Sequence, residues 1–361
     1  MKSIALAAGG TAGHIQPALT CARTIKKNNL NIDVFFIGTA KGLEQQLISN
    51  TGFELNLIPA VPMPRRLSLE IIFFPFKLIQ SVLITLKIFR QKDVGCVVGF
   101  GAYVSLPAYI AAFLKGIPVI VHEGNKKPGF ANKIGAIFAK EVFQMFPGSI
   151  KNAKTIGMPI RQELKKFNKE SLKNEAIKFF NLNEKYKTLF VFGGSQGAKS
   201  INHALAGLVP LLEGKNIQVI HSIGLKNQVE PELKNYSFYH PYSYLERMDL
   251  AYAASDLVVS RAGAMTIAEQ SLLGIPAIYV PFAVGNGEQI LNVRELINAG
   301  AGFLVLDSEI SSQKIYDLVM NNIFDENKLQ NISQKAKNFG LLDADIEITK
   351  LATDLVSKEN N

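Results

Sequence analysis

Residues 3–14 read SIALAAGGTAGH, and residues 188–198 read TLFVFGGSQGA. Both stretches place an apolar strand, a glycine-rich loop with a hydroxyl side chain and the expected start of a helix in the same order, 184 residues apart. Such a loop offers backbone N–H groups at a helix N-terminus, where anions bind. The repeat therefore predicts two nucleotide-binding-type domains that face one another across a cleft. Either loop taken alone could be only a tight turn between strand and helix.

The rest of the chain has the pattern of an α/β protein with two Rossmann-like parallel sheets. Its 361 residues, 48% of them hydrophobic, are enough for two cores. Near-continuous apolar runs separated by helical stretches indicate parallel strands covered on both faces. We expect strands at 33–38, 96–100, 118–122, 141–146, 188–192, 218–223, 256–260 and 277–281. We place the domains at 1–160 and 161–340, with a C-terminal helix within 341–361.

The charge is unevenly distributed. Residues 1–160 hold 18 lysines and arginines against 7 acidic residues, a net charge of +11, whereas the rest of the chain is at −2. A positive half-chain indicates an anionic membrane, a nucleic acid or an acidic ligand as its partner. Cys21 and Cys96 fall in an expected helix and strand. Two core thiols in a reducing cytoplasm fit this pattern better than a disulfide.

Residues 65–92 combine Phe, Ile and Leu side chains with Arg65, Arg66, Lys77, Lys87, Arg90 and Lys92. Three interpretations are open: a membrane-spanning helix, a buried core helix and an amphipathic element at a membrane surface. Lys77 and Lys87 interrupt the apolar run, and we expect Pro75 to break the helix, which argues against a span. The basic N-terminal half favours the surface element, because anionic headgroups attract Lys and Arg.

Neither glycine loop has the usual anchors for NAD or for ATP. The first is not G-x-G-x-x-G, and the second expected strand ends at Gly38 and Thr39 without a carboxylate for a ribose. In the second loop, Ala198 separates Gly197 from Lys199 and breaks the P-loop pattern.

A third segment, residues 260–270, reads SRAGAMTIAEQ. We expect a strand to end at Ser260 and a helix to begin near Ala264, where free N–H groups and the helix dipole suit a diphosphate. Glu269, one turn further, is placed to accept hydrogen bonds from a ribose diol. Alternatively, its carboxylate interacts only with the helix dipole.

Together these motifs resemble the MurG family of cell-wall N-acetylglucosaminyltransferases. The segments that carry the resemblance are 9–14 (GGTAGH), 99–105 (GFGAYVS), 122–125 (HEGN), 157–161 (GMPIR), 193–198 (GGSQGA) and 261–266 (RAGAMT). The matches run in order from residue 4 to about residue 302. The chain departs from the family pattern at Ala12, where glycine is usual, at Gly124, where glutamine is usual, and at 287–289.

The resemblance implies a GT-B fold, with an N-terminal acceptor and membrane domain, a C-terminal UDP-sugar domain and a last helix that returns to the first domain. The implied reaction is inverting transfer of GlcNAc from UDP-GlcNAc to the C4 hydroxyl of MurNAc in undecaprenyl-pyrophosphoryl-MurNAc-pentapeptide (lipid I), giving lipid II. Contacts to the nucleotide sugar are implied for Thr11, Ala12, Gly13, Asn125, Arg161, Ser195, Leu245, Ala264, Met265, Thr266, Ile267, Ala268, Glu269 and Gln289.

Such a reaction needs a general base on the acceptor. His14 is the candidate, since the ordinary pKa of histidine, about 6.5, suits proton abstraction at neutral pH. A histidine that only hydrogen-bonds the loop or the diphosphate is the alternative. Glu123 is the reserve candidate, with a purely structural role as its alternative. Ser195, the backbone at 264–265 and Arg161 are expected to stabilise the departing UDP.

No cofactor or metal is expected, because the five histidines lack metal-ligand spacing. Asp343 and Asp345 form a D-x-D pattern that we interpret as helix capping. The expected partners are UDP-GlcNAc, lipid I, an anionic inner-membrane surface reached from its cytoplasmic side and other cell-wall synthesis proteins, with no nucleic acid. The rival functions are a diacylglycerol glycosyltransferase, a UDP-GlcNAc epimerase and a non-catalytic protein that binds nucleotide sugars at a membrane.

Overall fold

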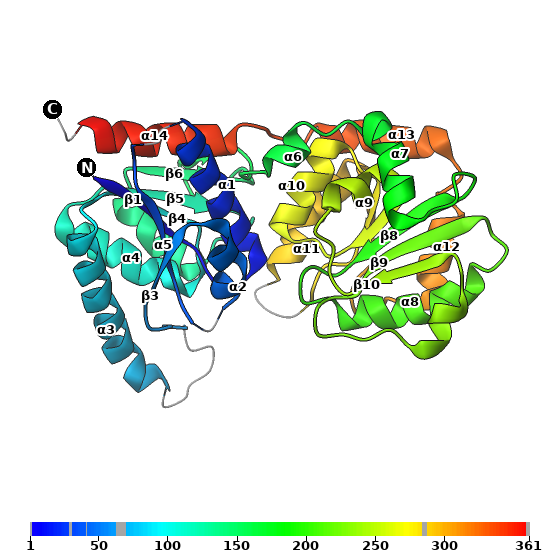
Figure 1. The fold of residues 1–361 in the computed structure, drawn as a ribbon, viewed down its shortest axis with the longest axis horizontal. Helices are drawn as coiled ribbons and strands as arrows, with labels where there is room; N and C mark the ends of the chain where they lie inside the picture. The colour runs from blue at the N-terminus through cyan, green and yellow to red at the C-terminus, as the bar shows by residue number, and fades with distance from the viewer. Residues whose placement is uncertain (1, 29–30, 41, 63–69, 284–286, 359–361) are drawn as a thin grey trace. The chain divides into compact units, whose positions relative to one another are not determined.

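The computed structural model describes residues 2–28, 31–40, 42–62, 70–283 and 287–358. The chain divides into two compact units. Unit 1 comprises Met1–Arg161 and Leu341–Asn361, and unit 2 comprises Gln162–Gly340. Each unit is built around its own parallel sheet with helices on it (Figure 1). The prediction of two parallel-sheet α/β domains is confirmed.

The sheet of unit 1 has the strand order β3-β2-β1-β4-β5-β6-β7, and neighbouring strands run parallel. Its strands are β1 (Ser3–Ala7), β2 (Val34–Gly38), β3 (Glu54–Leu57), β4 (Val94–Gly99), β5 (Val119–Glu123), β6 (Glu141–Gln144) and β7 (Lys154–Thr155). The helices of this unit are α1 (Ala12–Asn28), α2 (Glu44–Ile48), η1 (Ser49–Thr51), α3 (Glu70–Gln91), α4 (Ala102–Lys115), α5 (Phe130–Phe138) and α14 (Ala344–Lys358). The central strands β1, β2, β4 and β5 are buried along their whole length, which explains their near-continuous apolar sequences.

The sheet of unit 2 repeats this order as β10-β9-β8-β11-β12-β13, again parallel. Its strands are β8 (Lys187–Phe192), β9 (Ile217–Ser222), β10 (Tyr239–Tyr242), β11 (Leu257–Ser260), β12 (Ala277–Tyr279) and β13 (Phe303–Leu304). Its helices are α6 (Gln162–Lys165), α7 (Lys169–Phe180), α8 (Lys199–Leu211), η2 (Pro231–Asn235), α9 (Met248–Ala254), α10 (Ala264–Leu273), α11 (Glu288–Asn298), α12 (Ser312–Met320) and α13 (Glu326–Lys337).

The last helix, α14, packs in the core of unit 1 with α1 and β4. Ile348, Ala352 and Val356 are buried there. Asp345, in the first turn of this helix, is also buried and accepts a hydrogen bond from Thr24 of α1 at 2.7 Å. The second carboxylate of the D-x-D pattern therefore fastens the C-terminal helix to the first domain.

Cys21 and Cys96 are both buried in the same hydrophobic core of unit 1. This agrees with the interpretation of both residues as core thiols.

The segment that contains Pro75 differs from the prediction. Pro75 does not break the helix, since α3 is continuous from Glu70 to Gln91. The proline lies in the second turn, where its missing N–H removes a single hydrogen bond close to the helix end. Arg65 and Arg66 lie outside the described residues.

Candidate active site

The candidate residues gather at the carboxyl ends of the parallel strands. In each sheet the strand order reverses at the first strand. The chain first builds the sheet to one side of that strand and then continues on its other side, so the reversal lies between β1 and β4 in unit 1 and between β8 and β11 in unit 2. The loops that follow such a pair diverge to opposite faces of the sheet and leave a crevice for ligands. The glycine loop after β1 and its counterpart after β8 both lie at this point.

In unit 1, the loop after β1 ends at Thr11, and Ala12, Gly13 and His14 form the first turn of α1. The Thr11 hydroxyl and His14 Nδ1 are 3.1 Å apart, a hydrogen bond whose direction depends on the histidine tautomer. The ring lies beside the loop after β4, because a Cβ built on Gly101 would be 3.5 Å from His14 Cδ2. Gly101 has φ +89°, a conformation that favours glycine. His14 is half-buried, so its ring remains accessible.

Glu123, the reserve base, ends β5 and is only 3% exposed. Its carboxylate accepts hydrogen bonds from the backbone N–H groups of Asn125 at 2.8 Å and Gly129 at 3.0 Å, and from the Asn132 side-chain amide at 2.9 Å. Burial raises the pKa of Glu123, while these donors oppose the shift. The carboxylate organises the 124–129 loop and sets the backbone of Asn125, so the geometry favours a positioning role for Glu123 over proton abstraction.

Two side chains that sequence reasoning missed support this carboxylate. Asn132 of α5 donates to Glu123, and its amide oxygen accepts a hydrogen bond from the Tyr109 hydroxyl at 2.8 Å. Both residues are fully buried. Neither lies in a motif that indicates chemistry, so their sequence gave no signal of this role.

His122, the neighbour of Glu123, is held in its neutral form. Its Nε2 lies 2.8 Å from the carbonyl oxygen of Gly157, so this nitrogen carries the proton and donates. Burial lowers the pKa of His122 to about 4. This hydrogen bond holds the neutral imidazole against the backbone of Gly157, shortly before the chain enters unit 2.

In unit 2, the loop after β8 carries Ser195. Gly194 and Gly197 adopt φ of +89° and +75°, and the Gly197 N–H donates to the Gly194 carbonyl at 2.9 Å. The loop is fixed from outside by the Leu225 N–H, which donates to the Ser195 carbonyl at 3.3 Å. The Ser195 side chain is half-buried at the entrance to α8.

The helix predicted to begin near Ala264 is confirmed, since α10 begins at that residue. Gly263 precedes it and has no side chain to cap the helix, so the N-terminal N–H groups of the first turn face outward for an anion. Met265 and Thr266 are half-buried in this turn, whereas Ile267 and Ala268 face the core. Glu269 is mostly buried, and one of its oxygens accepts a hydrogen bond from Tyr252 at 3.2 Å.

Arg261 begins the 261–266 motif and is not among the predicted site residues, yet the structure gives it a central position. Its guanidinium donates to Asp307 at 2.5 Å, to Ser200 of α8 at 2.9 Å and to the Val280 carbonyl at 3.1 Å. It also lies over the ring of Phe282, 5.2 Å from the ring centre. Arg261 therefore ties the start of α10 to the helix that follows the Ser195 loop.

The other predicted residues lie at the same edges of their sheets. Leu245 is buried in the connection from β10 to α9. Gln289, in the first turn of α11, accepts a hydrogen bond from the Phe282 N–H at 2.9 Å. Arg161 is the last residue of the first segment of unit 1 and is half-buried. Among the described residues, no group of three or more His, Cys, Asp or Glu side chains could hold a metal ion.

Comparison with known proteins identifies the family. The glycosyltransferase family 28 N-terminal domain matches residues 4–144, and the C-terminal domain of the same family matches residues 188–348. The UDP-N-acetylglucosamine–N-acetylmuramyl-(pentapeptide) pyrophosphoryl-undecaprenol N-acetylglucosamine transferase of Streptomyces coelicolor is 42% identical over 95% of both chains. The enzyme of the same name from Mycobacterium leprae is 40% identical over 99% of this chain and 90% of its own.

Solved structures agree with this result. MurG of Acinetobacter baumannii matches with a TM-score of 0.79 and 26% identity, covering 98% of this chain and all of its own. The UDP-GlcNAc 2-epimerase of Neisseria meningitidis, bound to UDP-GlcNAc, matches with a TM-score of 0.67 at 16% identity over 99% of this chain, which shows a shared fold. The fold and the family models define a glycosyltransferase of family 28. Within that class, the chain belongs to the MurG family of N-acetylglucosamine transferases.

Proposed function

We propose that this protein transfers GlcNAc from UDP-GlcNAc to the C4 hydroxyl of MurNAc in lipid I, with inversion, and so makes lipid II. The observation that carries the proposal is full-length identity of about 40% to transferases named for this reaction. The duplicated glycine loops at the carboxyl ends of the two sheets support it, because each is suited to a phosphate-bearing ligand.

The chemical step is a single displacement. The acceptor oxygen forms a bond to the anomeric carbon of GlcNAc, the bond from that carbon to the diphosphate breaks, and UDP leaves with the electron pair. The acceptor proton passes to His14 Nε2. This requires the tautomer in which Nδ1 carries the proton and donates to Thr11, so Thr11 orients the base.

Unit 2 holds the donor in this proposal. The N–H groups at the start of α10 and the Ser195 loop bind the diphosphate and stabilise the charge that develops on it. Glu269 accepts hydrogen bonds from the ribose, since a carboxylate has several acceptor sites and can bind the ribose alongside Tyr252. Leu245 and Gln289 complete the contacts from unit 2, and Asn125 and Arg161 are the contacts expected from unit 1.

Release of UDP tests this function against its rivals. Purified protein with UDP-GlcNAc is expected to release UDP only when lipid I is supplied. An epimerase would act on UDP-GlcNAc without a lipid, a diacylglycerol glycosyltransferase would respond to diacylglycerol instead, and a non-catalytic binding protein would release no UDP under any of these conditions.

We further propose that α3 places the enzyme on the cytoplasmic face of an anionic membrane. Ile72, Phe76, Ile79 and Leu83 recur at helical spacing and are each at least 57% exposed, so they form an apolar stripe along the helix. Exposed Lys87 and Arg90 continue the same face toward the helix C-terminus. Such a surface suits insertion at the headgroup level, with the cations on anionic lipid.

The surface element is favoured over the two alternatives. The stretch Ile72–Gln91 is long and apolar enough to cross a membrane, and only 28% of the residues in its most apolar part are buried. A buried core helix would not expose this stripe. Its last turns pack on unit 1 through Val82, Ile88 and Phe89, and α3 connects β3 to β4 of one sheet, which favours a helix that lies on the membrane over one that spans it. Lys92 forms an ion pair with Glu54, so it is not counted among the lipid-facing cations.

Replacing Lys77, Lys87 and Arg90 by glutamine is expected to weaken binding to anionic vesicles by up to about 150-fold, at about 1 kcal/mol for each charge. High salt should mimic the change for the wild type through shorter screening lengths. Co-sedimentation at two salt concentrations measures both effects. The matched control replaces the exposed residues Lys178, Lys215 and Lys226 of unit 2, and should bind like the wild type. Equal, salt-insensitive binding by all three proteins would refute the membrane role of α3.

A further inference from the structure

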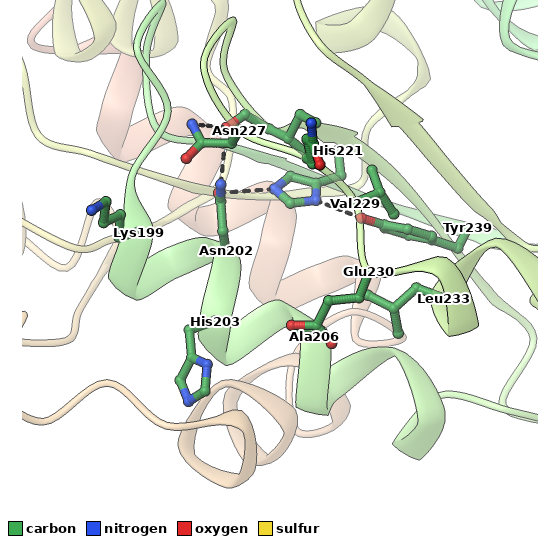
Figure 2. A pocket seen from close by; sticks show the side chains of 12 residues that line it. Lys199, Asn202, His203, Ala206, His221, Asn227, Val229, Glu230, Leu233 and Tyr239 are labelled. Carbon is green, nitrogen blue, oxygen red and sulfur yellow. Dashed lines mark hydrogen bonds between the residues drawn. The ribbon is translucent and has the colours of Figure 1, made fainter.

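A buried histidine in unit 2 lies behind the Ser195 loop and outside the residues assigned to the donor. His221, on β9, is 2% exposed and lines a cavity of about 230 Å³. Figure 2 shows its ring between the Tyr239 hydroxyl on one side and the Asn202 side chain on the other, with Asn227 above Asn202. The four side chains come from β9, β10, α8 and the connection that follows β9.

Tyr239, His221, Asn202 and Asn227 form a row of hydrogen-bonded side chains that ends on backbone carbonyls. Because a carbonyl can only accept, it fixes the direction of each hydrogen bond from Asn202 to Tyr239. Asn202 Nδ2 donates to the Ile223 carbonyl at 2.9 Å, so Asn202 Oδ1 is an acceptor. His221 Nε2, 3.2 Å from that oxygen, must therefore carry the proton. His221 Nδ1 is then the acceptor for the Tyr239 hydroxyl at 2.8 Å. The imidazole is neutral, and burial lowers the pKa of His221 to about 3, which keeps it so at physiological pH.

The row ends on the glycine loop. The Ile223 carbonyl also accepts a hydrogen bond from Asn227 Nδ2 at 3.0 Å, and the same amide donates to the Gln196 carbonyl at 3.0 Å. Gln196 lies between Ser195 and Gly197. The two backbones touch there, because a Cβ added at Gly197 would be 2.1 Å from the Ile223 oxygen and one added at Gly224 would be 2.2 Å from the Gly197 nitrogen. Glycine is required on both sides for this approach.

We propose that His221, Asn202, Tyr239 and Asn227 are positioning residues that hold the Ser195 loop in the conformation that receives the donor diphosphate. The proposal rests on the assignment of that loop to the diphosphate under the proposed function. The row contacts the loop through the hydrogen bond from Asn227 to the Gln196 carbonyl. It therefore affects the ligand only by positioning the loop backbone. A loop fixed in this way loses little conformational freedom when the donor binds, and that saving appears as affinity.

Two substitutions break the row at opposite ends. Asn227→Asp is isosteric but replaces the donating amide by an oxygen that faces two carbonyls. Tyr239→Phe removes only the hydroxyl that donates a hydrogen bond to His221. We expect the dissociation constant for UDP, measured by calorimetry, to rise about tenfold in Asn227→Asp, which corresponds to about 1.4 kcal/mol. Tyr239→Phe should raise it by a smaller factor. In both variants KM for UDP-GlcNAc should rise while kcat at saturating donor stays within about twofold of the wild type.

The matched control is Tyr279→Phe, which removes a buried hydroxyl without a hydrogen-bond partner elsewhere in unit 2. It should leave UDP affinity unchanged. A role of the row in stability alone would lower the melting temperature of Asn227→Asp and Tyr239→Phe without changing UDP affinity in the folded fraction, and that result would overturn the inference. If wild-type protein itself fails to bind UDP, the donor assignment fails and the inference with it. If the wild type binds UDP and both variants bind it with the same affinity, the inference about the row is wrong while the donor assignment stands.

Discussion

Replacing His14 by alanine is expected to lower kcat about 10²–10⁴-fold while the affinity for UDP changes little. The reason is that the imidazole ends the first glycine loop, in unit 1, and is proposed to take the acceptor proton in the chemical step, whereas the donor is assigned to unit 2. Single-turnover kinetics with saturating UDP-GlcNAc and calorimetry with UDP measure the two quantities separately.

Thr11 offers a sharper version of this test. If Nδ1–H of His14 donates to the Thr11 hydroxyl, Thr11→Val removes the acceptor that fixes the tautomer, and Thr11→Ser keeps it. We therefore expect Thr11→Val to lower kcat and Thr11→Ser to restore most of it. His203→Ala, which removes an exposed histidine of α8, is the matched control and should be fully active. If UDP affinity collapses in step with the rate in His14→Ala, His14 is a donor ligand and the base lies elsewhere.

Glu269→Ala is expected to weaken UDP binding by roughly 2–4 kcal/mol, or about 30- to 1,000-fold, if it removes two charge-assisted hydrogen bonds to the ribose. Glu269 lies on α10, one turn beyond the N–H groups assigned to the diphosphate. Glu269→Gln retains one acceptor oxygen and should fall between the wild type and Glu269→Ala.

Tyr252→Phe separates the ribose contact of Glu269 from its hydrogen bond with Tyr252. The substitution removes the bond that Tyr252 donates and leaves the proposed ribose contact in place. It should leave UDP affinity within about threefold of the wild type, because the carboxylate keeps both oxygens as acceptors for the ribose. Unchanged UDP affinity in Glu269→Ala would exclude Glu269 from the donor site and leave it the structural role of a carboxylate near the helix dipole.

The features that were predictable from sequence are those set by local patterns. The two glycine loops, the start of α10 at Ala264 and the parallel strands follow from runs of a few residues, because backbone conformation and strand burial leave a local signature. Pro75 shows where such signals fail. A proline is a helix breaker on average, yet near a helix end it costs only one hydrogen bond, and packing of Val82, Ile88 and Phe89 on unit 1 outweighs that loss.

The side chains that organise the site were not predictable, because their partners are distant in sequence. Arg261 lies in a motif, but its ion pair with Asp307 spans 46 residues and depends on the fold. Tyr109 and Asn132 have ordinary core sequences, and only the structure shows that they support Glu123. The same holds for Lys92, which sequence placed with the membrane-facing cations and which the structure pairs with Glu54. Local sequence specifies the loops, whereas long-range packing decides how each loop is held.

The central claim is that this chain joins one GlcNAc to lipid I. The most direct measurement incubates the purified protein with isotopically labelled UDP-GlcNAc and lipid I, then follows the lipid by mass spectrometry and UDP by chromatography. We expect the lipid to gain one N-acetylhexosamine carrying the label, with one UDP released for each product and no label transferred to undecaprenyl phosphate. Labelled UDP-GlcNAc that is consumed without any gain in mass of lipid I, or lipid I that remains unchanged while UDP-GlcNAc stays intact, would contradict the account.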